Sequence, residues 1–423
     1  MSLVVNSGGG GGIKIGNAVS ISLKAAEDIE KNTLVGAKIS LISAKDQGYF
    51  IPYHIQSMPC RIDDNHFIHA GHGYNNITCY AQVCTVADNG AITGGTKLQL
   101  NANSQNAIPG IRFGMSDKRY LYQGLIGNST SEQFGLLGIE DDGVTVSLKS
   151  QCAMQHYSNA IVIQLDERRF CRMYVDVAIN TFKAAVYNID NDVISLETTH
   201  DLKLDSALNG KSPDINATRI DDYTFLVKYS QNDLKFTKAF VAKYNPVLKA
   251  WSDYETLVIS ATLQVSGLDI NVDGTTVLII NRNVIGAKHY AVDIGADYTL
   301  TLRMLSDMQE TTAGCTPLLG RIFIGFDRTD LSSDAEAILK IYLMSKNGIL
   351  PIAKKQLALK YERFSNGFIK LSEDTFIGHP FGSDYFFGVL KFEVKESCDS
   401  LIPIGITKDG VGQGQVGQVF IKE

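Results

Sequence analysis

Three histidines, His66, His69 and His72, stand close together in the sequence and could in principle bind a metal ion. Imidazole nitrogens are common zinc ligands, and a zinc site needs several ligands to converge. Alternate residues of a strand share a face, so in an extended chain His66 and His72 would lie on one face and His69 on the other. We therefore interpret all three as ordinary polar positions and predict no metal site.

Acidic turns are the second group of residues that could do chemistry. They stand at Asp63-Asp64, Asp166-Glu167, Asp221-Asp222 and Asp327. Converging carboxylates could bind calcium, and two carboxylates at a set separation could cleave a glycosidic bond. However, a feature that recurs along the whole chain is typical of architecture, and no pair stands out from the others. We interpret these residues as structural turns.

Common catalytic and cofactor motifs are absent from the sequence. It contains no Gly-x-Ser-x-Gly elbow, no phosphate-binding loop and no dinucleotide fingerprint. The seven cysteines are scattered and include no Cys-x-x-Cys pair, so we interpret them as small apolar residues. The sequence thus predicts no catalytic residues, no cofactor and no enzymatic activity.

The acidic turns belong to a repeat. An apolar residue follows each copy of the turn, at Phe67, Tyr120, Phe170, Phe225, Val277, Leu331 and Phe376. Successive members of this set are between 45 and 55 residues apart. A nearly fixed period of this size indicates one supersecondary unit that is repeated.

One repeat unit can be divided into four strands. In the fourth copy they cover residues 214–220, 224–229, 238–244 and 247–251, and turn residues separate them. Four strands joined by hairpins form the blade of a β-propeller. Seven copies therefore predict an all-β fold, a seven-bladed β-propeller over residues 48–399. The last unit lacks its fourth strand, and we expect residues 48–57 to supply it, since a propeller must close.

The two ends of the chain do not match the repeat. Residues 13–47 and 400–423 both show strand-like alternation, and closure of the propeller would bring them together. We expect them to form one small β domain, a module for attachment. Residues 1–12 end in Gly8, Gly9, Gly10, Gly11 and Gly12. This arm is either a flexible linker or a backbone threaded through a tight assembly contact.

Charge and hydropathy exclude two classes of partner. The formal net charge is −6, so no overall attraction to nucleic acid is expected. No apolar run approaches the ~20 residues of a membrane helix, and no membrane insertion is expected. The first residues lack the basic and apolar regions of an export signal.

Four aromatic residues are candidates for surface recognition. Tyr74, Tyr122, Phe381 and Tyr385 stand near glycine, asparagine or serine in expected connections. Such compositions suit contact with sugars or protein surfaces. The alternative, that these rings pack between blades, stays open.

Both ends of the chain resemble one family. The frame from Ala25 through Ile29 to Val35 is similar to the opening of small β modules in tailed-bacteriophage virion proteins, with Asn32 where glycine is usual. Residues 404–407 and 412–419 resemble the matching close of such modules. The resemblance covers roughly 45 residues and implies that the terminal module attaches to the virion while the propeller projects. It implies no catalytic residues.

The expected function is therefore a non-enzymatic structural component of a bacteriophage virion, in the tail, collar or fibre apparatus. The expected location is the virion, after synthesis in the host cytoplasm. Expected partners are other virion proteins, further copies of this chain in a homo-oligomer, and a host surface glycan. One alternative is a virion-associated enzyme that degrades polysaccharide, with a carboxylate pair in the propeller funnel. Another is a bacterial adhesin, which would need an export signal.

Overall fold

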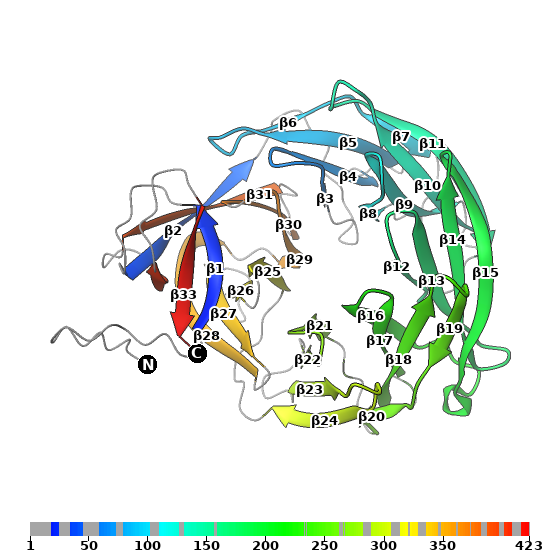
Figure 1. The fold of residues 1–423 in the computed structure, drawn as a ribbon. Coiled ribbons are helices and arrows are strands. Elements are labelled where there is room, and N and C mark those ends of the chain that lie inside the picture. Colours follow the sequence, from blue (N-terminus) through cyan, green and yellow to red (C-terminus); the bar gives the residue numbers. More distant parts are fainter. Residues whose placement is uncertain are drawn as a thin grey trace. The chain divides into compact units, whose positions relative to one another are not determined.

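The computed structural model contains antiparallel sheets over most of the chain (Figure 1). It describes residues 18–24, 34–44, 59–72, 79–101, 110–126, 131–155, 159–231, 233, 235–261, 265, 267–281, 289–305, 314–319, 322–328, 336–345, 348–360, 363–372, 374–381, 387–396, 402–407 and 416–422. Within these residues the one helical element is a 3-10 turn, η1 (Ser206–Leu208). No helix among them is long and apolar enough to cross a membrane.

Six sheets follow one another in chain order, and we number them as blades. Blade 1 contains β3 (Cys60–Arg61), β4 (His66–His72), β5 (Cys79–Val86), β6 (Ile92–Gly94) and β7 (Leu98–Asn101). Blade 2 contains β8 (Gly110–Gly114), β9 (Arg119–Ile126), β10 (Ser131–Ile139) and β11 (Val146–Gln155). Blade 3 contains β12 (Ile161–Gln164), β13 (Arg169–Asp176), β14 (Thr181–Asp190) and β15 (Val193–Leu204).

The remaining three of these sheets have the same plan. Blade 4 contains β16 (Asp214–Asp221), β17 (Thr224–Gln231), β18 (Phe236–Asn245), β19 (Ala250–Asp253) and β20 (Leu257–Ser260). Blade 5 contains β21 (Gly267–Asn271), β22 (Thr276–Asn281), β23 (His289–Ile294) and β24 (Leu300–Leu305). Blade 6 contains β25 (Gly314–Leu319), β26 (Ile322–Arg328), β27 (Glu336–Ser345) and β28 (Gly348–Lys360). Each blade begins at its innermost strand (Figure 1).

The seventh sheet joins strands from both ends of the chain. Its strand order is β1 (Ala18–Lys24), β33 (Val416–Lys422), β32 (Ile402–Thr407), β2 (Leu34–Ala44), β31 (Phe387–Glu396), β30 (Thr375–Phe381) and β29 (Arg363–Lys370). The last three are the strands of blade 7, and the strand next to β31 is β2. Residues 48–57, which we expected in that place, lie outside the described residues.

The chain divides into two compact units. One consists of residues 1–39 and 392–423, and the other of residues 40–391. In the first unit β1 pairs with β33 over its whole length, from Ala18 opposite Lys422 to Lys24 opposite Val416. The prediction of an all-β propeller with a small β domain made from both ends is thereby confirmed.

The second strand of a blade is buried on both faces. In blade 3, Phe170 lies in a core shared with blade 2, whereas the next residue, Cys171, lies in a core shared with blade 4. In blade 4, Phe225 likewise faces blade 3 and Leu226 faces blade 5. Successive side chains of a strand point to opposite faces, so one strand contributes to two cores. This explains why the recurring apolar residue is a reliable marker of the repeat.

The acidic turns are structural in blades 1 and 3. Asp63 Oδ1 accepts the N–H groups of Asn65 and His66 at 2.9 and 2.8 Å. Asp166 Oδ1 makes the equivalent bonds with Arg168 and Arg169, at 2.9 and 2.8 Å. Such side-chain bonds to the backbone two and three residues on stabilise a tight turn.

Blade 6 departs from the predicted register. Its first hairpin joins β25, which ends at Leu319, to β26, which begins at Ile322. Asp327 therefore lies within β26 and not in a turn, and the predicted marker Leu331 lies outside the described residues. The buried aromatic residue in the second strand of this blade is Phe323, a member of the core shared with blade 5.

In blades 1, 3 and 5 the residue that ends the inner strand fastens its blade to the preceding one. At this position Arg61 Nε donates to the carbonyl of Leu371 at 2.6 Å, Gln164 Nε2 to that of Gly114 at 2.8 Å, and Asn271 Nδ2 to that of Arg219 at 2.8 Å. Arg219 Nη2 donates to the carbonyls of Gln164 and Leu165. We call these four side chains the inter-blade latches. Each of them donates a hydrogen bond to a backbone carbonyl at the edge of a blade, which would otherwise have no donor from a neighbouring strand.

Candidate functional site

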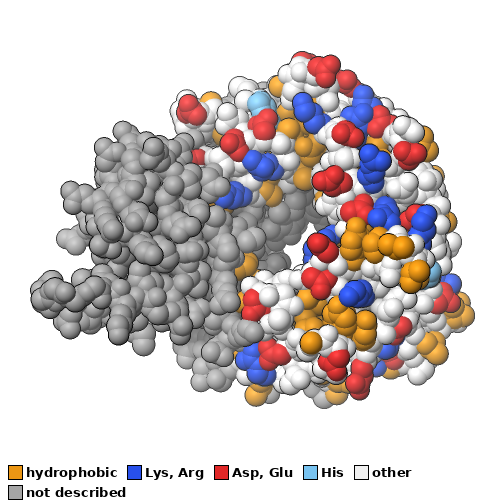
Figure 2. All heavy atoms as spheres, in the orientation of Figure 1, with side chains coloured by type: hydrophobic (Ala, Val, Ile, Leu, Met, Phe, Trp, Pro, Cys, Tyr) orange, Lys and Arg blue, Asp and Glu red, His pale blue; other side chains and the backbone are white. Residues whose placement is uncertain are grey.

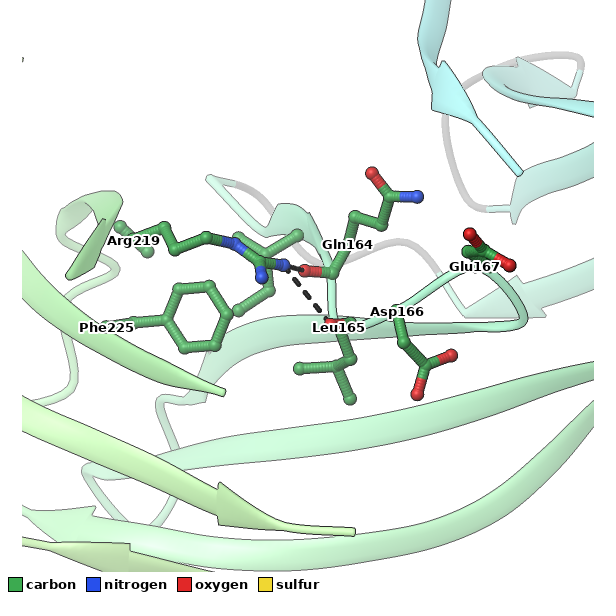
Figure 3. A pocket seen from close by; sticks show the side chains of 8 residues that line it. Gln164, Leu165, Asp166, Glu167, Arg219 and Phe225 are labelled. Carbon is green, nitrogen blue, oxygen red and sulfur yellow. Dashed lines mark hydrogen bonds between the residues drawn. The ribbon is translucent and has the colours of Figure 1, made fainter. Parts of the chain in front are cut away.

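A pocket lies where the inner strands of blades 3 and 4 meet (Figure 3). Its volume is about 400 Å³. The lining residues are Ile163, Gln164, Leu165, Asp166, Glu167, Ala217, Arg219 and Phe225. The first five come from the end of β12 and the turn that follows it, and the others from β16 and β17. The pocket thus combines two carboxylates and one guanidinium group with an apolar floor.

Arg219 is held in place from two sides. Its guanidinium carbon lies 5.3 Å from the centre of the Phe225 ring, and its Nη2 donates to the two backbone carbonyls of the latch (Figure 3). Its Nη1 lies 3.9 Å from Asp222 Oδ1, and both of these side chains are largely exposed, which makes this ion pair weak. No described residue accepts a hydrogen bond from Arg219 Nε. One edge of a fixed guanidinium is therefore open to a ligand.

The Asp166 carboxylate already accepts hydrogen bonds from the protein at both of its oxygens and is not available to a ligand. Besides the two backbone groups of the turn, its carboxylate accepts Arg169 Nε at 2.8 Å and the hydroxyl of Tyr223 at 3.2 Å. Burial alone would raise the pKa of Asp166, but the Arg168 N–H and the side chain and N–H of Arg169 together lower it. These contacts commit the Asp166 carboxylate to the turn and to the neighbouring blade.

Glu167 differs from Asp166 in this respect. It is exposed, and its carboxylate makes no hydrogen bond or ion pair with any described residue. Only its backbone carbonyl is bound, by the N–H of Ser116 at 2.9 Å. Figure 3 shows its side chain directed away from Asp166 at the tip of the turn. Glu167 therefore provides a free hydrogen-bond acceptor in the lining of the pocket.

The predicted recognition residues do not converge on this pocket. Tyr122 is 2% exposed and lies in the core between blades 1 and 2, where its hydroxyl accepts Gln151 Nε2 at 2.9 Å. Its place in the surface set was thus wrong, because it stands on a second strand that is buried on both faces. Phe381 ends β30. Tyr74, Tyr385 and the glycines from Gly8 to Gly12 lie outside the described residues.

The histidines do not assemble a metal site within the described chain. His66 Nδ1 lies 2.8 Å from Asp63 Oδ1 in the turn of blade 1, whereas His69 is fully buried in β4. No group of three or more His, Cys, Asp or Glu side chains in the described ranges could hold a metal ion together.

Comparisons with known proteins find solved structures that are similar, but no family. No known family model matches the chain, and no curated protein matches it. A protein from Lactobacillus plantarum is similar in structure, at 11% identity and a TM-score of 0.47, over 76% of this chain and 96% of that one. A 6-phosphogluconolactonase candidate from Bacteroides uniformis has 12% identity and a TM-score of 0.49, over 85% and 100% of the two chains. The periplasmic gluconolactonase of Pseudomonas aeruginosa has 11% identity and a TM-score of 0.48, over 86% and 100%.

These comparisons correct two predictions. The names of these structures contradict the predicted non-enzymatic role in a virion and the prediction that the chain is not an enzyme, since two of the three are named as lactonases and none as a virion protein. The virion prediction depended on short motifs at the two ends, whereas the propeller makes up most of the chain. At such low identity the likeness concerns the fold alone. The family resemblance and the predicted location and partners stay untested predictions.

Proposed function

We propose that the protein binds a small neutral ligand rich in hydroxyl groups, of the sugar class, in the pocket between blades 3 and 4. The observation that supports this most is the free carboxylate of Glu167 in a pocket that also contains the open Nε edge of Arg219. A carboxylate accepts hydrogen bonds from hydroxyl groups, and a guanidinium donates to their oxygen atoms. A polyol offers both kinds of group on adjacent carbon atoms.

The size and position of the pocket support the same ligand class. A volume of about 400 Å³ lies in the range of roughly 300–1,000 Å³ that is usual for small-molecule sites. The inner strands hold the polar groups in place, because Arg219 is a latch and the Glu167 turn is fixed by Asp166. Preorganised groups lose little entropy when a ligand binds.

The test is a calorimetric titration with glucose as the neutral polyhydroxy probe. We expect saturable binding to the wild-type protein and an affinity about tenfold weaker for Glu167→Gln, since a hydrogen bond to a charged group contributes roughly 1.5 kcal/mol. Glu255→Gln removes the same charge from an exposed residue outside the pocket and should leave the affinity unchanged. Equal affinities for the wild type and Glu167→Gln would refute the proposal, as would the absence of saturation.

A further inference from the structure

A second polar network lies outside the pocket, between blades 2 and 3. It consists of Arg112 on β8, Gln123 on β9, Glu132 on β10 and Arg172 on β13. None of these residues lines the pocket of Figure 3. Gln123, Glu132 and Arg172 are buried, whereas Arg112 is exposed. The network therefore runs from the protein interior to a surface.

Arg112 stands at an irregularity of the innermost strand of blade 2. Ile111 pairs with Tyr122 and Phe113 pairs with Leu121, so Arg112 is an extra residue without its own partner on β9. Such a β-bulge redirects a side chain out of the regular alternation of the strand. The described inner strands border a hollow in the centre of the face shown in Figure 2. β8, which carries Arg112, is one of these inner strands (Figure 1).

A chain of hydrogen bonds orients Arg112 from behind. Arg112 Nε donates to Gln123 Oε1 at 2.6 Å. Gln123 Nε2 donates in turn to Glu132 Oε1, and Arg172 Nη2 donates to the other oxygen, Glu132 Oε2. Each Glu132 oxygen thus has its own donor, and the Gln123 side chain is fixed at both ends. The Arg112 guanidinium is held in one orientation by groups that cannot easily move.

The charges of the network do not cancel. Two arginines and one glutamate leave one positive charge, and Arg172 is the partner of Glu132 in a direct ion pair. The surrounding protein lowers the pKa of Arg112 by desolvation, against the charge of Glu132, although the side chain is accessible to solvent. Arginine stays protonated in proteins, so the net charge belongs to the exposed end of the network.

Two other arginines in the described blades, Arg119 and Arg303, have their guanidinium groups occupied by carboxylates. Arg119 binds Asp192 through Nε and Nη2 at 2.6 and 2.9 Å. Arg303 contacts both oxygens of Asp293. No described residue accepts a hydrogen bond from Nη1 or Nη2 of Arg112. Its fork of donors is thus free, and it is presented by a rigid support.

We infer that Arg112 forms a binding site for an oxyanion, a carboxylate or phosphate group that enters the central hollow of the propeller. A guanidinium matches the two oxygens of such a group with two parallel hydrogen bonds. The buried network supplies the fixed orientation that makes this binding favourable. The site is separate from the sugar-class pocket and does not depend on that proposal.

The test is a titration with inorganic phosphate and, separately, with acetate, at an ionic strength kept constant with sodium chloride. We expect saturable binding of at least one of the two anions to the wild-type protein. Arg112→Gln should weaken this binding on the order of ten- to hundredfold, as expected for the loss of charge-assisted hydrogen bonds. Arg112→Lys, which keeps the charge but loses the fork, should bind with intermediate affinity.

The control variant is Arg168→Gln, which removes the same charge from an exposed arginine in the first hairpin of blade 3. It should bind the anions as the wild type does. The inference is refuted if Arg112→Gln binds as tightly as the wild type, if Arg168→Gln loses as much affinity, or if neither anion saturates. Thermal unfolding of each variant without ligand shows whether it is folded.

Discussion

Among the described residues, two buried ionic networks that connect neighbouring blades can be compared, and they differ in one respect. Between blades 4 and 5, Lys228 Nζ donates to Asp269 Oδ1 and Asn216 Nδ2 donates to Asp269 Oδ2, each at 2.6 Å. The Lys228 and Asp269 side chains are 6% and 2% exposed, and their charges cancel. Between blades 2 and 3, the corresponding charges leave one cation, Arg112, at the surface. We call the first network closed, because its charges cancel, and the second network open, because one exposed cation remains.

This difference shows how one fold can use the same kind of network for two purposes. A closed ionic network connects two blades and offers nothing to a ligand. An open network connects two blades through Glu132 and Arg172 and also orients a free guanidinium. The additional element is a single residue, Arg112, which is inserted at a bulge of an inner strand. The variants below separate these two roles by their effects on stability and on binding.

The largest loss of stability is expected for Glu132→Gln. This change leaves Arg172 buried without its counter-charge and leaves one acceptor oxygen for the two donors, Gln123 Nε2 and Arg172 Nη2. Removing one partner of a buried ion pair costs roughly 3–5 kcal/mol. Chemical denaturation should therefore show a strongly lowered free energy of unfolding. A loss below about 1 kcal/mol would mean that Glu132 does not neutralise Arg172 in the folded protein.

Asp269→Leu should have the next largest effect. It leaves Lys228 buried and unpaired, at a cost of about 3 kcal/mol. The double variant Lys228→Leu/Asp269→Leu should regain most of that loss, because two apolar side chains of similar volume need no pairing. Denaturation of the single and double variants gives the interaction energy between the two sites. A double variant that is less stable than Asp269→Leu would show that Lys228 stabilises the fold through contacts other than its ion pair with Asp269.

Asp205→Asn should cost about 1–2 kcal/mol near neutral pH and should change the acid sensitivity of the fold. Burial alone would raise the pKa of Asp205, but hydrogen bonds from Lys238, Tyr229 and the N–H of Ala207 lower it. Its contribution to stability is therefore complete above the unfolded-state pKa and is lost as the pH falls through the lowered folded-state pKa.

The free energy of unfolding of the wild type should accordingly fall more steeply than that of Asp205→Asn below about pH 4. Denaturation curves recorded at a series of pH values measure the difference. Parallel curves for the two proteins would contradict the assigned hydrogen bonds. Asp205, Lys238 and Tyr229 form a third network, which is closed like that of Asp269. Because it is partly exposed, its loss should lower the free energy of unfolding by less.

The smallest change in stability is expected for Arg112→Gln. Because Arg112 is exposed and lies at the open end of its network, its replacement should change the free energy of unfolding by about 0.5 kcal/mol or less. Chemical denaturation in the absence of anions measures this change. A loss as large as that of Glu132→Gln would show that Arg112 fastens the blades together. The distinction between the open and the closed network would then disappear.

The repeat allowed the fold to be predicted from the sequence, because the marker residues must be apolar wherever a second strand is buried on both faces. Phe67, Phe170 and Phe225 show this directly. The acids of the turns were interpreted correctly in blades 1 and 3, since an aspartate that caps two backbone N–H groups has a local signature. Blade 6 was misread, since Asp327 has the composition of a turn residue but lies within a strand.

The sites were far less predictable. Tyr122 was taken for a surface residue because Gly124 follows it closely, but a glycine next to an aromatic residue does not distinguish a loop from a buried strand. The sequence around Arg112 gave no indication of a binding site, because a bulge depends on the register between strands and leaves no fixed spacing in the sequence. Glu132 and Arg172 meet across two blades although they are 40 residues apart. Only the packing of the blades brings such residues together.

The most direct test of the open network is the NMR signal of the Arg112 Nε–Hε group during titration with inorganic phosphate. The signal is assigned by its loss in Arg112→Gln. We predict that it shifts progressively and saturates, while the corresponding signal of Arg303, which contacts Asp293, stays in place. An Arg112 signal that does not move, or one that moves together with Arg303 in proportion to added salt, would contradict the assignment of an oxyanion site to this residue.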